Sequence, residues 1–467
     1  MARYRQIGLG FAVCLAMWSD ASIVVAREHL ALSADAQTAI GLAPAVGSVR
    51  LDEKALAHIL DLRAWVGLSN DQQFVDSLYA STTDAYVSAK GLVGGLRFSF
   101  DEADDVYAIS QLDWAADVIA QKLVLNFGDD VLAGVQVRAR VVSIFCKGCD
   151  KAKVLNVVES VEAPVGEGNR VEIVDVRLSL TELRTAQSLI ADYLDGAGTK
   201  YSGTGIDVAN NAVRVVGRAG VETTVRELFP DVPIAFVLDD VGQHDEVSKS
   251  DTLGYGVVEG GQQIYRTNLG PVYGSCTSGF AVQSGYGPFI LTAGHCANGG
   301  TCSTGQGWTQ GSMPLGVMAA CNLKGSVDGG LISTANVRNT IGRVHRNSSD
   351  YFRPINWGWT TQNIVGHQVC QHGYASFIAP NFDWQCGVIN DFAFRPTGIT
   401  SDGLPWNADF LGLTYASNYG DSGAALSWAN IYGNAAVGIH KSRDGTTAYA
   451  TKWERLSTLW GLTLTAP

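Results

Sequence analysis

The spacing of apolar residues predicts helices in the first half of the chain. One set recurs every three or four positions, as on the buried face of a helix: Ile109, Leu112, Ala116, Ile119 and Leu123. Ser179-Leu180-Thr181-Glu182 has the sequence of a capping box, so a second helix begins there, and Gly196 ends it. Residues 206–215 have the pattern of a hairpin that turns at Asn210-Asn211. We therefore expect an α/β or α+β fold for this half.

Apolar runs in the second half predict strands, and three of them adjoin residues that can carry chemistry. Residues 278–282 follow Cys276, residues 289–292 lead to His295 and Cys296, and residues 329–332 follow Asp328. Each of the first two runs has a cysteine at one end, so we expect them to be neighbouring strands joined by a disulfide beside the histidine. The periodicity changes to that of a helix near the C-terminus, at Trp453, Leu456, Leu459 and Trp460.

A serine lies among small residues in a fourth stretch, residues 418–426 (N-Y-G-D-S-G-A-A-L). The hydroxyl of Ser422 is a nucleophile only if a general base takes its proton and donors hold the resulting oxyanion. Gly420 and Gly423 allow the tight backbone turn that aims N–H groups at a substrate carbonyl. By itself, however, a glycine next to a serine more often marks a plain turn.

The order of the three candidate side chains restricts the kind of hydrolase. An α/β-hydrolase carries serine, then acid, then histidine, but the last histidine of this chain is His440, and the acids after it are Asp444 and Glu454. The subtilisin order places the aspartate before the histidine and would leave Asp328 without a role.

The motifs L-T-A-G-H-C at 291–296 and G-D-S-G at 420–423, in this order, resemble those of the chymotrypsin-fold serine peptidases. The resemblance is closest to the secreted bacterial branch of alpha-lytic protease and the streptogrisins, and it extends from about Gly254 to the C-terminus. It implies an all-β double β-barrel with a C-terminal helix, acting as a secreted serine endopeptidase made as a proenzyme. His295 would be the general base, Asp328 would orient it, Ser422 would be the nucleophile, and the N–H groups of Gly420 and Ser422 would form the oxyanion hole. Asp350 is the alternative acid.

Two departures from that family are visible. The motif continues with Ala424 and Ala425 where relatives have glycine and proline, and we expect the loop to form unless residue 424 needs a positive φ. In relatives, the aspartate matching Asp421 pairs with a buried cation, which in the bacterial branch is an arginine, but Gln371 stands at that place here. His372, another arginine or a freed amino terminus near Val257 would be the partner.

The resemblance also places the primary specificity pocket, with walls at residues 416–419 and 438–443. Ala416, Ser417, Tyr419 and His440 are the expected substrate-binding residues, and the lack of an aspartate at the pocket base argues against a preference for Lys or Arg. His440, near Lys441 and Arg443, would receive a glutamate carboxylate; small or apolar residues are the alternative substrates. A strand histidine that faces away from the pocket is an equally good interpretation of His440.

Nine cysteines are present, and eight remain if Cys14 is lost with a signal peptide. The resemblance implies Cys276–Cys296 and Cys370–Cys386, and these leave Cys302 and Cys321 as a third pair. Cys146-Lys147-Gly148-Cys149 is either a redox motif or a small structural disulfide, and we favour the disulfide. A zinc site is disfavoured, because the C-terminal half has no C-x-x-C with a second pair.

The expected organisation is a signal peptide (1–26), a pro-region (27–250) and a protease domain (251–467). Basic residues precede an apolar run of 7–18, and Val24-Val25-Ala26 is a plausible cleavage site. The pro-region would assist folding and then block the active site, since an all-β fold with many non-local contacts folds slowly. Acidic and polar residues at 239–251 suggest an exposed linker, with processing in 246–258.

Composition narrows the possible partners. The formal net charge of −12 argues against nucleic acid, and no later segment is apolar for long enough to span a membrane. We expect a monomer without metal or other cofactor that binds protein or peptide substrates. A catalytically silent binding protein on the same fold and an esterase are the competing hypotheses. The sequon at Asn347 matters only in a eukaryotic host.

Overall fold

The computed structural model describes most of the chain outside the first 37 residues. The described residues are 22–24, 38–40, 42–45, 48–81, 83–88, 92–161, 168–239, 257–267, 275–297, 301–311, 313–335, 337, 339–345, 352–360, 363–373, 385–415, 417, 420–430, 432–444 and 447–467. Most of the predicted signal peptide, the predicted processing segment up to residue 256, Asn347 and Asp350 lie outside them.

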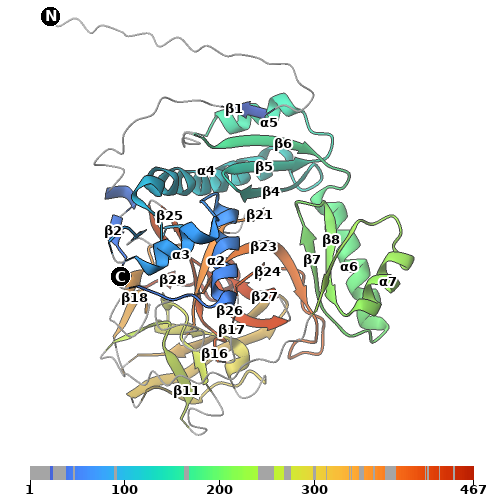
Figure 1. Cartoon of the computed structure of the whole chain (residues 1–467). Coiled ribbons are helices and arrows are strands. Elements are labelled where there is room, and N and C mark those ends of the chain that lie inside the picture. The colour runs from blue at the N-terminus through green and yellow to red at the C-terminus, as the bar shows by residue number, and fades with distance from the viewer. Residues whose placement is uncertain are drawn as a thin grey trace, which may run out of the picture.

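The N-terminal half is mixed α/β, as predicted, and its first sheet lies at the top of Figure 1. The strand order is β1 (Ser22–Val24), β6 (Arg170–Asp175), β5 (Val141–Cys146), β4 (Leu132–Arg138) and β21 (Ile364–Val365). Helices α4 (Ala103–Phe127) and α5 (Lys151–Glu159) pack beside it. The helix expected around residues 109–123 is therefore confirmed, and it extends further at both ends. The strand β1 falls inside the predicted signal peptide.

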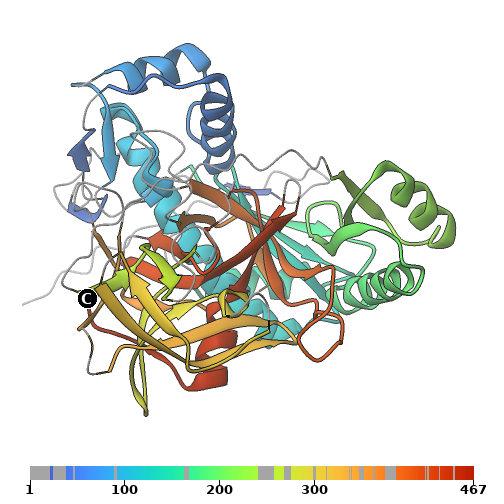
Figure 2. The same cartoon turned by 90° about the horizontal axis from the view of Figure 1, so that it is seen from below.

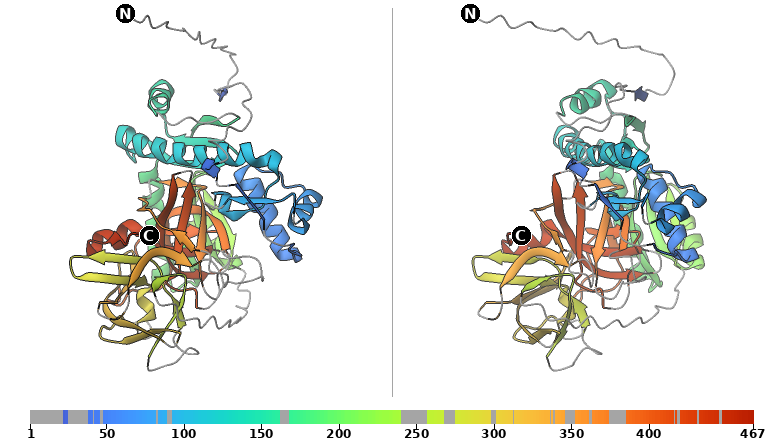
Figure 3. Two further views of the ribbon diagram at one scale, coloured as in Figure 1. Left: turned by 90° about the vertical axis from the view of Figure 1, so that its left-hand side faces the viewer. Right: turned by 60° about the vertical axis from the view of Figure 1, so that its left-hand side comes forward.

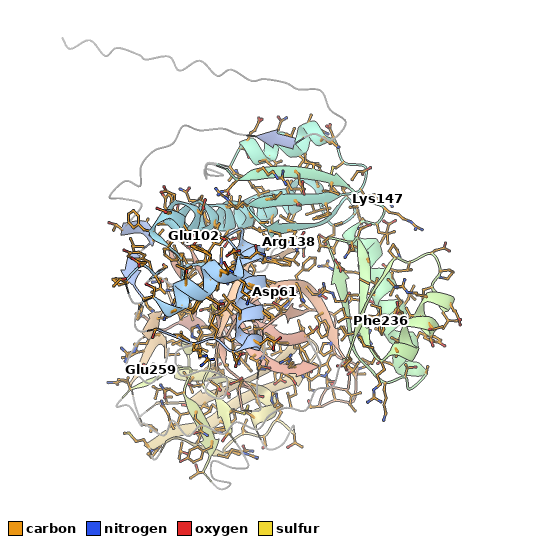
Figure 4. The ribbon with its side chains drawn as sticks, viewed as in Figure 1. Asp61, Glu102, Arg138, Lys147, Phe236 and Glu259 are labelled. Carbon is orange, nitrogen blue, oxygen red and sulfur yellow. A yellow bond between two sulfur atoms is a disulfide. The ribbon has the colours of Figure 1, made fainter. Side chains whose placement is uncertain are left out.

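A smaller group of elements adjoins α4. It comprises β2 (Leu42–Pro44), α2 (Glu53–Val66), α3 (Gln72–Ala80), β3 (Tyr86–Ser88), η1 (Leu92–Gly95) and η2 (Phe100–Glu102). A buried ion pair joins Arg63 of α2 to Glu102, the residue that precedes α4 and is labelled in Figure 4. This pair ties α2 to the start of α4.

The second α/β unit of this half lies at the right of Figure 1. It contains α6 (Leu180–Gly196), β7 (Tyr201–Asp207), β8 (Ala212–Gly217), α7 (Ala219–Leu228) and β9 (Ile234–Leu238), and Phe236 of β9 is labelled in Figure 4. The predicted capping box is present, because Ser179 and Glu182 each accept the other's backbone N–H. The predicted hairpin is also confirmed: β7 pairs with β8 through a turn in which Asn211 has φ 47°. The αL conformation suits asparagine better than most residues.

The C-terminal half contains two curved sheets and a short helix. The first sheet, yellow and orange at the bottom of Figure 3, has the order β12, β11, β15, β16, β17, β14, β13, β28. Its strands are β11 (Gln263–Arg266), β12 (Ser275–Thr277), β13 (Ala281–Ser284), β14 (Gly287–Thr292), β15 (Gly307–Gln310), β16 (Met313–Lys324), β17 (Val327–Ser333) and β28 (Thr463–Leu464). This sheet curls but does not close through pairing of its described strands.

The second sheet closes into a barrel, shown in orange and red in Figures 2 and 3. Six strands follow one another and the first pairs with the last: β22 (Gln368–His372), β25 (Ala425–Asn430), β26 (Gly433–Asp444), β27 (Thr447–Lys452), β24 (Phe410–Leu413) and β23 (Gln385–Pro396). The remaining elements are η3 (Gly294–Cys296), β10 (Val258–Gly260), β18 (Thr340–His345), β19 (Phe352–Pro354), β20 (Trp357–Gly358) and α9 (Trp453–Trp460). The predicted C-terminal helix is therefore confirmed as α9.

Strands of the two halves are hydrogen-bonded to each other at two places. β21 pairs in parallel with β4, and the end of β23 pairs antiparallel with β7, so the sheet of β4 and the sheet of β7 each continue into the C-terminal half. Side chains reinforce the contact, because Trp359 Nε1 donates to Asp117 Oδ1 of α4 and Trp65 Nε1 donates to the Gly366 carbonyl. One apolar core contains residues of both halves. The N-terminal half is therefore packed against the closed barrel rather than tethered to it.

Candidate active site

The turn after β14 positions His295. β14 pairs with β17, and the chain then turns through Ala293 into the short helix η3. A side chain at Gly294 would come within 2.5 Å of the Asn322 carbonyl and 2.7 Å of the Gly329 carbonyl, so only glycine fits there. The result is that His295 emerges where β14 ends, beside β17.

Asp328 at the start of β17 contacts His295 through both carboxylate oxygens. Its Oδ1 accepts the backbone N–H of His295 (3.0 Å), and its Oδ2 lies 2.8 Å from Nδ1 of the imidazole. The aspartate is fully buried. Burial alone would raise the pKa of Asp328, but the His295 imidazole, its hydrogen bonds and the Lys441 ammonium outweigh burial and lower the pKa. The carboxylate therefore stays ionised.

Ser422, in the loop that leads into β25 of the closed barrel, completes the line of contacts. Its Oγ lies 2.8 Å from Nε2 of His295, the ring nitrogen that faces away from Asp328. The sequence-predicted residues His295, Asp328 and Ser422 are thus brought together from η3, β17 and the loop before β25. The His295 side chain is about one-third exposed, so the contact is open to a substrate.

The loop of Ser422 is fixed by backbone hydrogen bonds. Thr277 N donates to the Ser422 carbonyl (2.8 Å), and Gly423 N donates to the His440 carbonyl (2.8 Å). Gly420 and Gly423 have φ of 105° and 89°, a region that favours glycine. Ala424 is buried and is not among the described residues with positive φ, so the alanine fits the loop as expected.

The predicted oxyanion donors are Gly420 and Ser422. Within the described part of the chain, we find no hydrogen bond from the backbone N–H of either residue.

Asp421 is fully buried behind this loop, against Gly373. A side chain at Gly373 would collide with the Asp421 carboxylate and lie 2.6 Å from Gln371 Nε2, which makes no hydrogen bond to a described residue. His372 directs Nε2 to the Ser427 hydroxyl (2.7 Å). Residue 371 is therefore next to Asp421, as the resemblance implies, with an amide in place of the arginine.

The expected pocket residues are placed in part. Ala416 and Tyr419 lie outside the described residues, while Ser417 and His440 are both buried. The His440 Nδ1 lies 2.8 Å from the Tyr415 hydroxyl. Burial, followed by the positive charges of His295, Lys441 and Arg443, lowers the pKa of His440 to about 3. Its imidazole is therefore neutral at ordinary pH.

The eight cysteines form the four pairs expected from the sequence. The pairs are Cys146–Cys149, Cys276–Cys296, Cys302–Cys321 and Cys370–Cys386. Cys276–Cys296 joins the residue after His295 to β12, and Lys147, labelled in Figure 4, lies within the Cys146–Cys149 turn. No group of residues suited to hold a metal ion occurs in the described ranges. Among the helices described, none is long and apolar enough to cross a membrane.

Two contacts of Asp328 have no signal in the sequence. Thr451 of β27 accepts the Asp328 N–H and donates to its carbonyl (both 3.1 Å), which joins the two sheets behind the aspartate. Lys441 places Nζ 3.5 Å from Asp328 Oδ2. Neither residue belongs to a motif, so only the folded chain reveals these contacts.

Comparison with known proteins gives structural matches only. No family model matches the sequence, and no curated protein matches it. A Nocardiopsis protease matches 45% of this chain and 99% of its own, with 22% identity and a TM-score of 0.36. Protease A of Thermobifida fusca matches 45% and 100%, with 22% identity and a TM-score of 0.34. A glutamic-acid-specific serine protease that uses a histidine triad in substrate binding matches 44% and 100%, with 22% identity and a TM-score of 0.33.

Because each of these TM-scores is below 0.5, the fold is described from the strand pairing of this chain alone. The strand pairing of the chain itself, with a curled sheet beside a closed six-stranded barrel and a C-terminal helix, agrees with the fold that the motifs imply. The C-terminal half of this chain therefore has the all-β, two-sheet architecture with a C-terminal helix that the motifs predict.

Proposed function

We propose that the C-terminal half is a serine endopeptidase that cleaves peptide bonds through an acyl-enzyme. The observation that carries the proposal is the position of the His295 ring, 2.8 Å from the Asp328 carboxylate on one side and 2.8 Å from the Ser422 hydroxyl on the other. A hydroxyl, an imidazole and a buried carboxylate in line are the parts that activate a serine.

Each group would have one task in the reaction. The Ser422 Oγ attacks the substrate carbonyl while Nε2 of His295 takes its proton, and Asp328 holds Nδ1–H so that Nε2 is the free base. The N–H groups of Gly420 and Ser422 bind the oxyanion, each contributing about 3 kcal/mol. Nε2 then returns the proton to the leaving amine as the C–N bond breaks. Water repeats the sequence on the acyl-enzyme and releases the acid.

Covalent labelling by a fluorophosphonate tests this proposal. A nucleophilic serine displaces fluoride and becomes phosphonylated, so we expect one labelled residue, Ser422, located by mass spectrometry of the digested protein. A folded protein that has been processed to remove the proposed pro-region and still shows no label would instead support the alternative of a catalytically silent binding protein.

We propose further that residues 27–250 are the pro-region and that the protein is exported. The shared sheets support this, since β4 and β7 offer strand edges to β21 and β23 and would template the closed barrel. The disulfides support export, because such pairs persist in oxidising compartments.

Replacing Asp328 with asparagine is expected to lower kcat about 10,000-fold, because the amide no longer selects the Nδ1–H tautomer of His295. Steady-state hydrolysis of a small peptide ester measures the effect. Asp402→Asn is the control, since Asp402 is an aspartate paired with Lys324 (3.5 Å) outside the site, and kcat should not change. A loss below tenfold in Asp328→Asn would contradict the role.

For the residue before the cleaved bond, we propose a preference for glutamate over small or apolar side chains. The Tyr415 hydroxyl can donate to Nδ1 of His440, which leaves Nε2–H to donate to a substrate carboxylate. Because His440 is neutral, the preference should be modest, about tenfold in kcat/KM for Glu over Phe or Ala.

Each protein serves as its own control, because the preference is measured as the ratio of kcat/KM for two peptides on the same protein. The ratio of kcat/KM between two peptides does not depend on how much of the protein is active. We expect His440→Ala to lose the preference for glutamate, whereas equal ratios in wild type and variant, or a preference for Phe or Ala in wild type, would remove His440 from the specificity pocket.

A further inference from the structure

A bulge in β26 places Lys441 beside the triad. In the pairing of β26 with β27, His440 lies opposite Ala450 and Ser442 lies opposite Tyr449, so Lys441 is an extra residue without a partner position. A bulge interrupts the alternation of side chains and turns the extra one in a new direction. The side chain of Lys441 is only 12% exposed, although it carries a charged group.

The ammonium group of Lys441 lies next to the carboxylate oxygen of Asp328 that also contacts the imidazole of His295. Its Nζ is 3.5 Å from Asp328 Oδ2, and His295 Nδ1 is 2.8 Å from the same atom. Two aromatic rings hold the cation there, Trp406 at 4.5 Å and Tyr449 at 5.2 Å from ring centroid to Nζ. The backbone carbonyl of Lys441 also lies 3.4 Å from the Ser422 hydroxyl.

We propose that Lys441 is a positioning residue of the triad, whose ammonium holds the Asp328 carboxylate against the imidazole, so that the pH dependence of hydrolysis depends on the charge at residue 441. The inference rests on the proposed peptidase function. Two positive charges on one carboxylate oxygen repel each other, so the imidazolium form is less stable with Lys441 present than without it.

The other charged groups around the site do not form an ion pair with the Asp328 carboxylate in the way that Lys441 does. His440 is neutral at ordinary pH, and Arg443 is the next cation along β26. Lys452 on β27 is a second partly buried lysine, but its Nζ is paired with Asp409 (2.7 Å). Within the ion pairs of the described residues, Lys441 is the only lysine bound to Asp328.

The pH dependence of kcat/KM tests the inference, since its acidic limb reports protonation of the free enzyme. Protein produced from the full chain is assayed on an uncharged peptide ester between pH 4 and 9. Lys441→Met removes the charge, and Lys441→Gln removes the charge but keeps a hydrogen-bond donor. We expect both to move the acidic limb to higher pH by about one unit.

Two control variants separate charge from structure. Lys441→Arg keeps a cation and should return the limb close to its wild-type position, while Lys452→Met removes a comparable buried ion pair and should leave the limb in place. If the acidic limb of kcat/KM does not move in Lys441→Met or Lys441→Gln, while Ser422 is still labelled by a fluorophosphonate, the role of Lys441 is overturned. The proposed peptidase function would then still stand. A processed wild-type protein that is not labelled would overturn the peptidase function and this inference with it.

Discussion

Replacement of Ser422 by alanine is expected to lower kcat for peptide hydrolysis about a million-fold and to leave the fold intact. Under the proposed mechanism, the variant loses the oxygen that forms the acyl-enzyme, and the remaining His295–Asp328 pair has no nucleophile to activate. Ser422 is half-buried and its hydroxyl supports no core contact, so thermal unfolding should stay within a few degrees of wild type. Progress curves over hours, at high protein concentration, measure so large a loss.

The matched control is Ser427→Ala. Ser427 is also a serine bonded to a histidine ring, because its Oγ lies 2.7 Å from His372 Nε2, but it is buried in β25. We expect this variant to lose some stability and to keep kcat per active site within a few-fold of wild type. Equal losses in the two variants would mean that Ser422 acts through structure rather than as a nucleophile.

The second large effect is expected at the junction of the two halves, from Gly205→Val. Gly205 in β7 faces the buried Asp391 of β23, and any side chain there would collide with the carboxylate that accepts the Ile206 N–H (2.9 Å). Overpacking costs about 1–3 kcal/mol, and separating the strands would leave a buried acceptor unpaired at a similar additional cost. We expect the yield of active protein to fall at least tenfold.

Two measurements distinguish a folding defect from a catalytic one. Titration of active sites with a fluorophosphonate gives the yield of active protein. The kcat per titrated site gives the catalytic rate of the molecules that have folded. If β7 templates the barrel, Gly205→Val should lower the yield and leave kcat per site unchanged. Gly220→Ala is the control, because a side chain at this position of α7 meets nothing within 4 Å and alanine favours the helix. Wild-type yield in Gly205→Val would show that the β7–β23 contact does not assist folding.

Asp391 adds a dependence on pH to the same junction. Burial raises the pKa of Asp391 to about 7, although Arg214 and two backbone N–H groups oppose the shift. A carboxyl whose pKa is raised on folding costs no stability below its unfolded pKa near 4, and the cost grows until the pH passes about 7. The junction of β7 with β23 is therefore expected to be strongest under acidic conditions.

Local chemistry explains why much of the site could be predicted from sequence. Glycines at 420 and 423 mark a tight turn whichever strand lies beside it, and their positive φ values agree with that. The capping box at Ser179 depends on four consecutive residues, and the structure contains it. His295, Asp328 and Ser422 belong to short motifs whose order restricted the type of hydrolase, and the structure brings the three side chains together.

The remaining features depend on contacts between distant segments. The sequence predicts the hairpin of β7 and β8, but it does not say which other strand pairs with the outer edge of β7, because any free edge presents the same backbone groups. The direction of Lys441 follows from one extra residue in β26 relative to β27, and register is a property of the paired strands.

The sequence by itself predicted the helices at 109–123, 179–196 and 453–460, the hairpin at 206–215, the cysteine pairs and the three candidate catalytic residues, since each belongs to a local pattern or a short motif. Only the tertiary structure decided that the N-terminal half shares its sheets with the barrel and that Lys441 forms an ion pair with the Asp328 carboxylate. These contacts join residues that are adjacent only after the sheets have formed, so no local pattern encodes them.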